Sequence, residues 1–492
     1  MTRRLQTLLK GVLPLVAIAL LSLGLMDPDA RFSEPFGVLW WLIGPLFLLV
    51  LSLFAFKTFR SAENWEYGAL AATLGVLLLF LGLESGLRIV ASPTLANDVA
   101  LPDHPDFDQR SRREVVAALR AAGEEAVPFV TPTTLAQFRE PHPFITIPTL
   151  THDGVETHPL GGVPDARTVA CREDGTWILH ATDEKGFYNP PGLISQSRID
   201  VALVGDSYTQ GICVPLEDSF AGLIRQAIPQ TLNLGMGGNG PLTVLGSIKE
   251  YLTQRKPPLV IWFLYENDSP DLVRESRNPT LYGYLNGATR PVLDAIEKGP
   301  LQNYFDQFLA AATAVEEIRN GKESSEVRRS YLLQHTSYAV YRDLKSRVLG
   351  DQSSRTLFDE TLGEMSATVS AWGGRLLIVT LPSRTSLEAG LGFPQSKMLE
   401  ALFKKHDVTV FDLRPAFLAQ RQQLAQLFPR WGTHYNARGH ALVAREVLGY
   451  LNRSGLQSAG GVSSRVVLRQ TPPSRDGASM LTAAAATLPT LR

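Results

Sequence analysis

The sequence predicts an α/β domain built on a parallel sheet, preceded in the chain by an apolar segment. Strand and helix patterns alternate over residues 198–453, which is typical of βαβ units. Three apolar runs lie before residue 91, and the high hydrophobic content of the 492-residue chain, 45%, is concentrated there. Polar residues follow several of the predicted strands, at the edge where open parallel sheets bind ligands.

The three apolar runs are expected to be transmembrane helices over about residues 8–26, 36–56 and 67–90. A helix needs roughly 20 residues to cross the hydrocarbon core of a bilayer. The second and third runs reach this length. The first is shorter and could instead be the core of a signal peptide. Asp27–Ala30 is a poor cleavage site, however, and this favours a span.

Basic residues predict the orientation of these helices, since Lys and Arg are enriched on the cytoplasmic side. Three basic residues precede the first run, and Lys57 and Arg60 lie between the second and third. Both stretches are therefore expected inside, and the chain after Val90 outside. In a bacterium this places the chain in the inner membrane with its large domain in the periplasm.

The composition excludes several classes of function. The net charge of −1, from 47 basic and 48 acidic residues, gives no electrostatic reason to expect nucleic-acid binding. His152 and His158 fit no zinc-binding pattern such as HExxH. We therefore expect neither a metal nor a cofactor.

The two cysteines, Cys171 and Cys213, both lie in the part expected outside, where disulfides persist. Pairing them would close a loop of about 43 residues, worth at most about 4 kcal/mol in the chain-entropy model. We expect a disulfide. The alternative is two unrelated small apolar residues.

Two segments flank the α/β pattern. Residues 91–197 are rich in Pro, Asp, His and Thr, and only Arg113–Ala122 predicts a helix, so a linker and an irregular lead-in are expected. Residues 454–492 are rich in Ser, Ala, Pro and Thr and are expected to be disordered.

Within residues 198–453, five strands and several helices are predicted. The strands are Ile199–Val204, Thr231–Leu234, Leu259–Leu264, Arg375–Leu381 and Val408–Leu413. The helices are Glu217–Ile228, Pro241–Gln254, Thr356–Trp372 and Asn436–Asn452. Two more, Pro300–Gly321 and Glu326–Leu349, predict a helical insertion over about residues 300–349. Asn436 is placed to cap the last helix.

Four segments deliver polar groups to the same sheet edge. Ser207 follows the first strand and could act as a nucleophile if a base such as His434 lies within hydrogen-bond reach. A tetrahedral intermediate also needs donors aimed at its oxyanion. The backbone N–H groups of Ser207 and Gly238 and the side-chain amide of Asn267 are suitable.

These segments read GDSYTQG at 205–211, NLGMGGNG at 233–240, YEND at 265–268 and THYNARGH at 433–440. In this order they resemble the four blocks of the SGNH/GDSL hydrolase superfamily. The resemblance covers about residues 198–453. It implies a flavodoxin-like three-layer α/β/α sandwich, with Ser207 as nucleophile, His434 as general base, and Gly238 and Asn267 as oxyanion donors. Members with N-terminal spans are similar to proteins of exopolysaccharide acetylation.

The chain departs from the family pattern in two places. Family members usually carry an acid two or three residues before the histidine, where this chain has Gly432 and Trp431. We expect a Ser–His dyad in which the Trp431 backbone carbonyl orients His434, with Asp412 as the alternative partner. Tyr265 stands where the third block usually has glycine.

The sequence thus predicts acyl transfer through a Ser207 acyl-enzyme, to water (an esterase) or to a sugar hydroxyl (an O-acyltransferase). The expected location favours an acylated glycan of the cell envelope or another acyl ester as substrate. For a transferase, a separate membrane protein is expected to supply the acyl group. The alternatives are a lipid or lysophospholipid esterase, and a non-catalytic glycan-binding scaffold on the same fold.

Overall fold

The structure, a computed structural model, describes residues 104–137, 148–322, 351–394 and 396–456. The three predicted spans, the helix expected at Glu326–Leu349 and nearly all of the tail lie outside the described residues. Among the described residues, no helix combines the length and apolar character needed to cross a bilayer. The chain divides into two compact units, and the one formed by His104–Ala312 and Ser354–Arg492 contains the sheet and the candidate site.

A parallel sheet of five strands lies at the centre of this unit, in the order β10-β9-β8-β6-β7. This order is that of doubly wound flavodoxin-like sheets, which confirms the predicted parallel α/β fold. The strands are β6 (Val201–Gly205), β7 (Thr231–Asn233), β8 (Leu259–Tyr265), β9 (Arg375–Leu381) and β10 (Thr409–Asp412).

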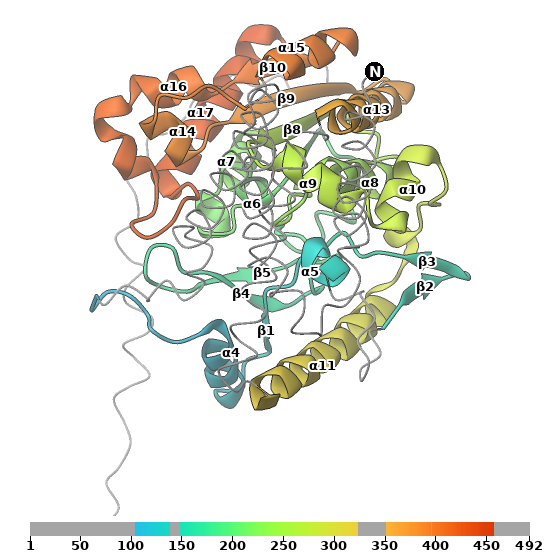
Figure 1. Ribbon diagram of the computed structural model, residues 1–492, viewed down its shortest axis with the longest axis vertical. Coiled ribbons are helices and arrows are strands. Elements are labelled where there is room, and N and C mark those ends of the chain that lie inside the picture. Colours follow the sequence, from blue (N-terminus) through green and yellow to red (C-terminus); the bar gives the residue numbers. More distant parts are fainter. Residues whose placement is uncertain (1–103, 138–147, 323–350, 395, 457–492) are drawn as a thin grey trace, which may run out of the picture. The chain divides into compact units, whose positions relative to one another are not determined.

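Helices cover both faces of the sheet because its strands are apolar on both sides. In β8, Trp262 belongs to one buried core and its neighbours Ile261 and Phe263 belong to the other. The first core includes α8 (Pro241–Tyr251), α13 (Asp351–Ala371) and α15 (Ser396–Lys405), and the second α7 (Phe220–Ala227) and α17 (Ala437–Ser454). Figure 1 shows the strands between these two groups of helices.

The other α-helices after β6 lie in the connections between strands, except α16 (Arg414–Ala419), which lies between β10 and α17. Those in the connections are α6 (Ser207–Gln210), α9 (Asp268–Glu275), α10 (Pro279–Asn286), α11 (Lys298–Lys322) and α14 (Arg384–Glu388). Asn436 caps α17 as predicted, because its side chain accepts hydrogen bonds from the Arg438 and Gly439 N–H groups.

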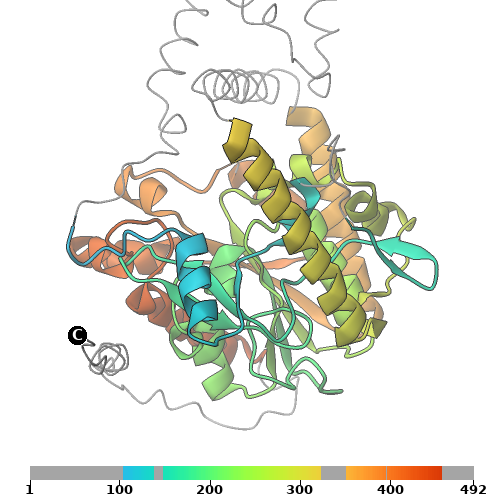
Figure 2. The ribbon, with the colours of Figure 1, turned by 90° about the horizontal axis from the view of Figure 1, so that it is seen from below.

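The lead-in is more regular than the sequence predicts. It contains α4 (Arg112–Ala121), α5 (Pro132–Gln137), a β2–β3 hairpin (Leu150–His152 and Val155–Thr157), and a separate sheet of order β1-β4-β5 (Ala126–Pro128, Arg167–Cys171 and Ile178–Ala181). Figure 2 shows this segment, blue to teal, with α4 and the hairpin well apart. The strands are three to five residues long, too short for a visible period of two.

The predicted disulfide is confirmed. Cys171, the last residue of β4, is bonded to Cys213, with a Cα–Cα distance of 5.1 Å. Cys213 lies in the turn that follows α6, so the disulfide joins the lead-in to the segment that carries Ser207.

Candidate active site

Ser207 is the first residue of α6, at the sharp turn that ends β6. Gly205 makes this turn possible because it adopts φ +148°, and a side chain there would collide with the Phe263 carbonyl, 2.7 Å from the added Cβ. Asp206 caps the helix by accepting the Tyr208 N–H at 3.0 Å. The Ser207 side chain is thus presented, half-buried, at the carboxyl end of the sheet.

His434 lies within hydrogen-bond reach of Ser207, as the sequence predicts for a nucleophile and its base. The distance from His434 Nε2 to Ser207 Oγ is 2.8 Å. His434 stands two residues before Asn436, the cap of α17, so the capped helix end holds its loop at the sheet edge. A neutral imidazole with its proton on Nδ1 leaves Nε2 free to accept the serine proton.

The other imidazole nitrogen has a carboxylate partner that the sequence analysis missed. His434 Nδ1 lies 2.6 Å from Glu173 Oε1, and the His434 backbone N–H donates to Glu173 Oε2 at 3.0 Å. The three side chains therefore form a Ser–His–Glu line, whose acid comes from the lead-in, two residues after the end of β4.

This geometry shows that the expected partners of His434 were wrong. The Trp431 backbone meets Glu173 rather than the imidazole, because its N–H donates to the Glu173 carbonyl at 3.0 Å. Asp412 is exposed and accepts from Thr380 Oγ1 at 2.7 Å and from the Arg414 N–H at 3.0 Å. The Glu173 carboxylate, from outside the four motifs, is the partner of His434 that was predicted to be the Trp431 carbonyl.

Glycine at position 432 explains how this carboxylate reaches the histidine. A Cβ built on Gly432 would overlap the carboxyl group of Glu173. SGNH/GDSL hydrolases usually carry an acid at this position. Here Gly432 has no side chain, and the Glu173 carboxylate occupies the space.

The environment of Glu173 favours its ionised form. Burial acts to raise the pKa of this carboxyl, but hydrogen bonds and charge interaction with His434, with help from the Thr433 backbone, lower the pKa below its usual value. An ionised carboxylate is the form that stabilises an imidazolium during proton transfer.

The two expected oxyanion donors flank the nucleophile strand. Gly238 follows β7 and Asn267 follows β8, and these strands are the two neighbours of β6. Gly238 is half-exposed and adopts φ +75°. The Asn267 side chain is exposed and does not cap α9. Their positions at the same edge are compatible with the predicted roles, which stay predictions.

Tyr265, the second departure from the family pattern, braces the site. Its ring stacks on Tyr208 with centroids 4.0 Å apart, and the Tyr208 ring lies 4.8 Å from that of His434. The two hydroxyls are 2.8 Å apart, and the Tyr208 hydroxyl also lies 2.8 Å from the Thr433 carbonyl. Since a carbonyl can only accept, the Tyr208 hydroxyl donates its hydrogen bond to the Thr433 carbonyl and accepts one from the Tyr265 hydroxyl. The pair thereby ties the histidine loop to β8.

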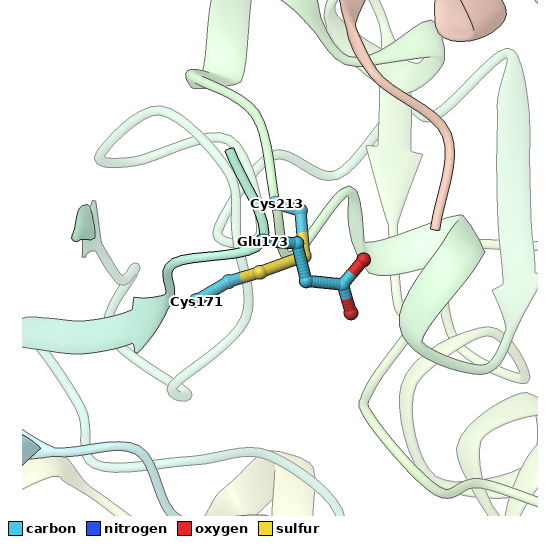
Figure 3. A group of neighbouring side chains, drawn as sticks. All are labelled: Cys171, Glu173 and Cys213. Atoms are coloured by element: carbon cyan, nitrogen blue, oxygen red, sulfur yellow. A yellow bond between two sulfur atoms is a disulfide. The ribbon is translucent and has the colours of Figure 1, made fainter. Parts of the chain in front are cut away.

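One group of possible metal-ligating atoms was found among the described residues, formed by Cys171, Glu173 and Cys213. Both sulfurs belong to the disulfide and therefore are not thiolates, the form in which cysteine binds metals. Figure 3 shows the Glu173 carboxylate beside the disulfide. In this oxidised state the group offers the Glu173 carboxylate as its one ligand, and this carboxylate is hydrogen-bonded to His434.

A signal for Glu173 was present in the sequence. The expected disulfide already brings Cys171 next to Cys213, which lies six residues after Ser207. Any acid close to Cys171 is thus a candidate for the missing member, and Glu173 and Asp174 are the acids that follow it.

The chain matches no protein-family model and no curated protein. Similar solved structures include esterases and acylhydrolases. A two-domain esterase active on acetylated mannans has 14% identity and a TM-score of 0.30, with 56% of this chain and 54% of that one covered. An acetyl xylan esterase has 13% identity and a TM-score of 0.30, covering 51% and 100%. The lipase/acylhydrolase from Enterococcus faecalis has 15% identity and a TM-score of 0.28, covering 51% and 96%.

The chain spans about half the length of the two-domain mannan esterase. The geometry of the Ser207, His434 and Glu173 side chains is the stronger indication of chemistry.

Proposed function

We propose that this chain transfers acyl groups through a covalent intermediate on Ser207, as an acyl-ester hydrolase or an O-acyltransferase. The observation that carries the proposal is the unbroken hydrogen-bonded line from Ser207 Oγ through the His434 imidazole to the Glu173 carboxylate, at 2.8 and 2.6 Å. A serine hydroxyl is a weak nucleophile, and such a line is the arrangement that activates it.

In the first half-reaction, Ser207 Oγ attacks the ester carbonyl carbon while its proton passes to His434 Nε2. Glu173 stabilises the imidazolium that results. The carbonyl oxygen becomes an oxyanion, for which Gly238 N–H, Ser207 N–H and the Asn267 amide are the proposed donors. When the intermediate collapses, the ester C–O bond breaks and His434 returns the proton to the leaving alcohol.

In the second half-reaction, an acceptor hydroxyl attacks the acyl-Ser207 carbonyl and gives its proton to His434. Water as acceptor releases a carboxylic acid, and a sugar hydroxyl gives a new ester. Collapse then returns the proton to Ser207 and regenerates the enzyme. Both acceptors use the same residues, so the triad serves either reaction.

The proposed substrate is an acylated glycan, or another acyl ester, outside the membrane. Three N-terminal apolar runs and the basic residues around them support a membrane anchor with this domain on the outer side. The Cys171–Cys213 disulfide supports the same location, because disulfides persist in oxidising compartments. For a transferase, we propose that a separate membrane protein delivers the acyl group.

The structure weakens the case for a non-catalytic glycan-binding scaffold. That alternative depended on the acid missing from the motif before His434. Glu173 supplies a carboxylate at 2.6 Å from the imidazole, and a binding scaffold has no need of a nucleophile, a base and an acid in hydrogen-bonded order.

The test is hydrolysis of p-nitrophenyl acetate by the purified full-length chain. Ser207→Ala and His434→Ala should each lower kcat/KM by roughly 10³-fold or more, because each removes a group that acts in the transition state. Labelling by a fluorophosphonate should be lost in Ser207→Ala.

The matched controls replace residues of the same types away from the site. Ser370→Ala, on the exposed side of α13, and His152→Ala, at the end of β2, should keep wild-type rates. Undetectable hydrolysis and no fluorophosphonate labelling of the wild type would reject the proposed reaction. Faster turnover of long-chain than of acetyl esters would favour the lipid esterase over the glycan enzyme.

A further inference from the structure

Glu173 and Ser207 follow strands that belong to different sheets. Ser207 is at the end of β6 in the five-stranded sheet, whereas Glu173 follows β4 in the β1-β4-β5 sheet. Within the part of the chain that the structure describes, no strand pairing joins these two sheets. The position of the acid relative to the nucleophile must therefore be set by contacts in the connecting segments.

Glu173 and Asp174 both contact the histidine loop. The Glu173 carbonyl accepts the Trp431 N–H at 3.0 Å, and the Asp174 side chain accepts the Arg430 N–H at 3.0 Å. Together with the carboxylate bonds to His434, they make the acid and the histidine loop one hydrogen-bonded group.

The covalent link between this group and the nucleophile segment is the disulfide, which adds to the hydrogen bonds of His434 with Ser207 and of Tyr208 with Thr433. Cys171 precedes Glu173 by two residues, and Cys213 follows Ser207 by six. The apolar cluster around the two cysteines is small, with Ala170 and Ile212 as its other buried members. The noncovalent packing in this cluster is thus limited. The Tyr188 hydroxyl of the lead-in also donates to the Val214 carbonyl at 3.5 Å, and the disulfide adds a covalent connection to the same turn.

The disulfide also lies close to the acid. The two sulfur atoms and a Glu173 carboxylate oxygen lie within 4.8 Å of one another. Figure 3 shows the carboxylate extending from beside the S–S bond. The disulfide and the carboxylate are therefore near neighbours in the site.

We propose that the Cys171–Cys213 disulfide is a positioning element of the catalytic site, which holds Glu173 in register with the Ser207–His434 pair. This inference rests on the proposed acyl-transfer reaction. It adds that the two cysteines determine whether Glu173 is placed to complete a triad with Ser207 and His434. Without the bond, the lead-in can shift against the turn after α6. A shift of about 1 Å in such a site can cost up to 10²-fold in rate.

The test is a double-mutant cycle in the full-length chain. Glu173→Gln should lower kcat by roughly 10²- to 10⁴-fold with little change in KM. The pair Cys171→Ser/Cys213→Ser should lower kcat by about 10- to 10²-fold. Combined with Glu173→Gln, the cysteine substitutions should cost less than about twofold more, because a carboxylate that is already absent cannot be misplaced.

A control separates positioning from general loss of stability. Val169→Ala removes a fully buried side chain from β4 and keeps the disulfide. It should lower the unfolding temperature while kcat at 25 °C stays within about twofold of wild type. Equal kcat losses in Val169→Ala and in the cysteine variant at equal loss of Tm would overturn the proposal.

A second readout does not depend on turnover. A short hydrogen bond to a carboxylate shifts the histidine Nδ1 proton strongly downfield in proton NMR. The wild type should show this resonance, Glu173→Gln should lose it, and the cysteine variant should show it weakened or lost. An unchanged resonance in the cysteine variant, or none in the wild type, would overturn the proposal. If the wild type showed the resonance but no hydrolysis, the proposed reaction would be rejected, while the positioning of Glu173 against His434 would stand.

Discussion

Gly432 lacks a side chain at the point where the Glu173 carboxylate meets the histidine loop. Gly432→Ala should therefore displace this carboxylate, since the new methyl group would overlap it. We expect kcat to fall by roughly 10²-fold, towards the value of Glu173→Gln. The measurement is steady-state hydrolysis, with a thermal melt to establish folding.

A control for this substitution is Gly392→Ala, in the loop after α14, where no heavy atom lies within 4 Å of the added Cβ. It should keep wild-type kcat. Full activity of Gly432→Ala would mean that the carboxylate does not occupy this space during turnover.

At the level of single residues, the sequence predicted two of the three members of the line. Ser207 and His434 follow strand patterns and lie in motifs, so local sequence identified them. Glu173 follows a strand of five residues in a segment without visible period, and its partner is 261 residues away in the chain. Local patterns carry no information about such a contact, which only the disulfide expectation could have suggested.

At the level of elements, the strands of the five-stranded sheet were predicted and the short strands of the lead-in were not. β9 has the predicted bounds, Arg375–Leu381, and β8 differs by one residue at its end. Both are buried on two faces and give continuous apolar runs. β1 to β5 depend on tertiary pairing, such as the parallel pairing of β1 with β4 across about forty residues of chain, and were not predicted.

The elements also explain why the fold prediction succeeded while the acid was assigned wrongly. Parallel order follows from alternating strands and helices, and it brings the ends of β6, β7 and β8 to one edge. The lead-in is not part of this alternation, and its contribution to the site follows from the disulfide and from backbone contacts to the histidine loop.

For the whole molecule, buried carboxyls predict how stability depends on pH. Burial raises the pKa of Asp183, Asp206, Glu250 and Glu275 to about 7 in the folded chain, against about 4 when unfolded. A raised pKa gives stability that is present below the unfolded value and is lost as pH rises through the folded value. The free energy of unfolding should thus be larger at pH 5 than at pH 8.

Glu250 offers the cleanest test, since it accepts hydrogen bonds from the Tyr284 hydroxyl and the Leu293 N–H and lies outside the candidate site. Glu250→Gln should reduce the stability difference between pH 5 and pH 8 by about 2 kcal/mol, measured by urea unfolding. Glu360→Gln, at an exposed position of α13, serves as the control. An unchanged difference in Glu250→Gln would show that Glu250 does not titrate in this range.

The Glu173 carboxyl has the opposite effect on how stability depends on pH. The lowered pKa of its carboxyl gives stability that is present above the unfolded value, near pH 4, and is lost as pH falls through the folded value. The molecule as a whole should therefore be most stable in mildly acidic solution, with the triad carboxylate ionised.

The most direct test of the central claim is whether Ser207 carries the acyl group during turnover. The full-length chain is mixed with p-nitrophenyl acetate, quenched in acid within the first turnovers, digested and analysed by mass spectrometry. We expect one acetyl group per chain, on the peptide that contains Ser207, with less acetyl trapped on Glu173→Gln at the same time. Acetylation of other residues only, or hydrolysis that persists at the wild-type rate in Ser207→Ala, would contradict the account.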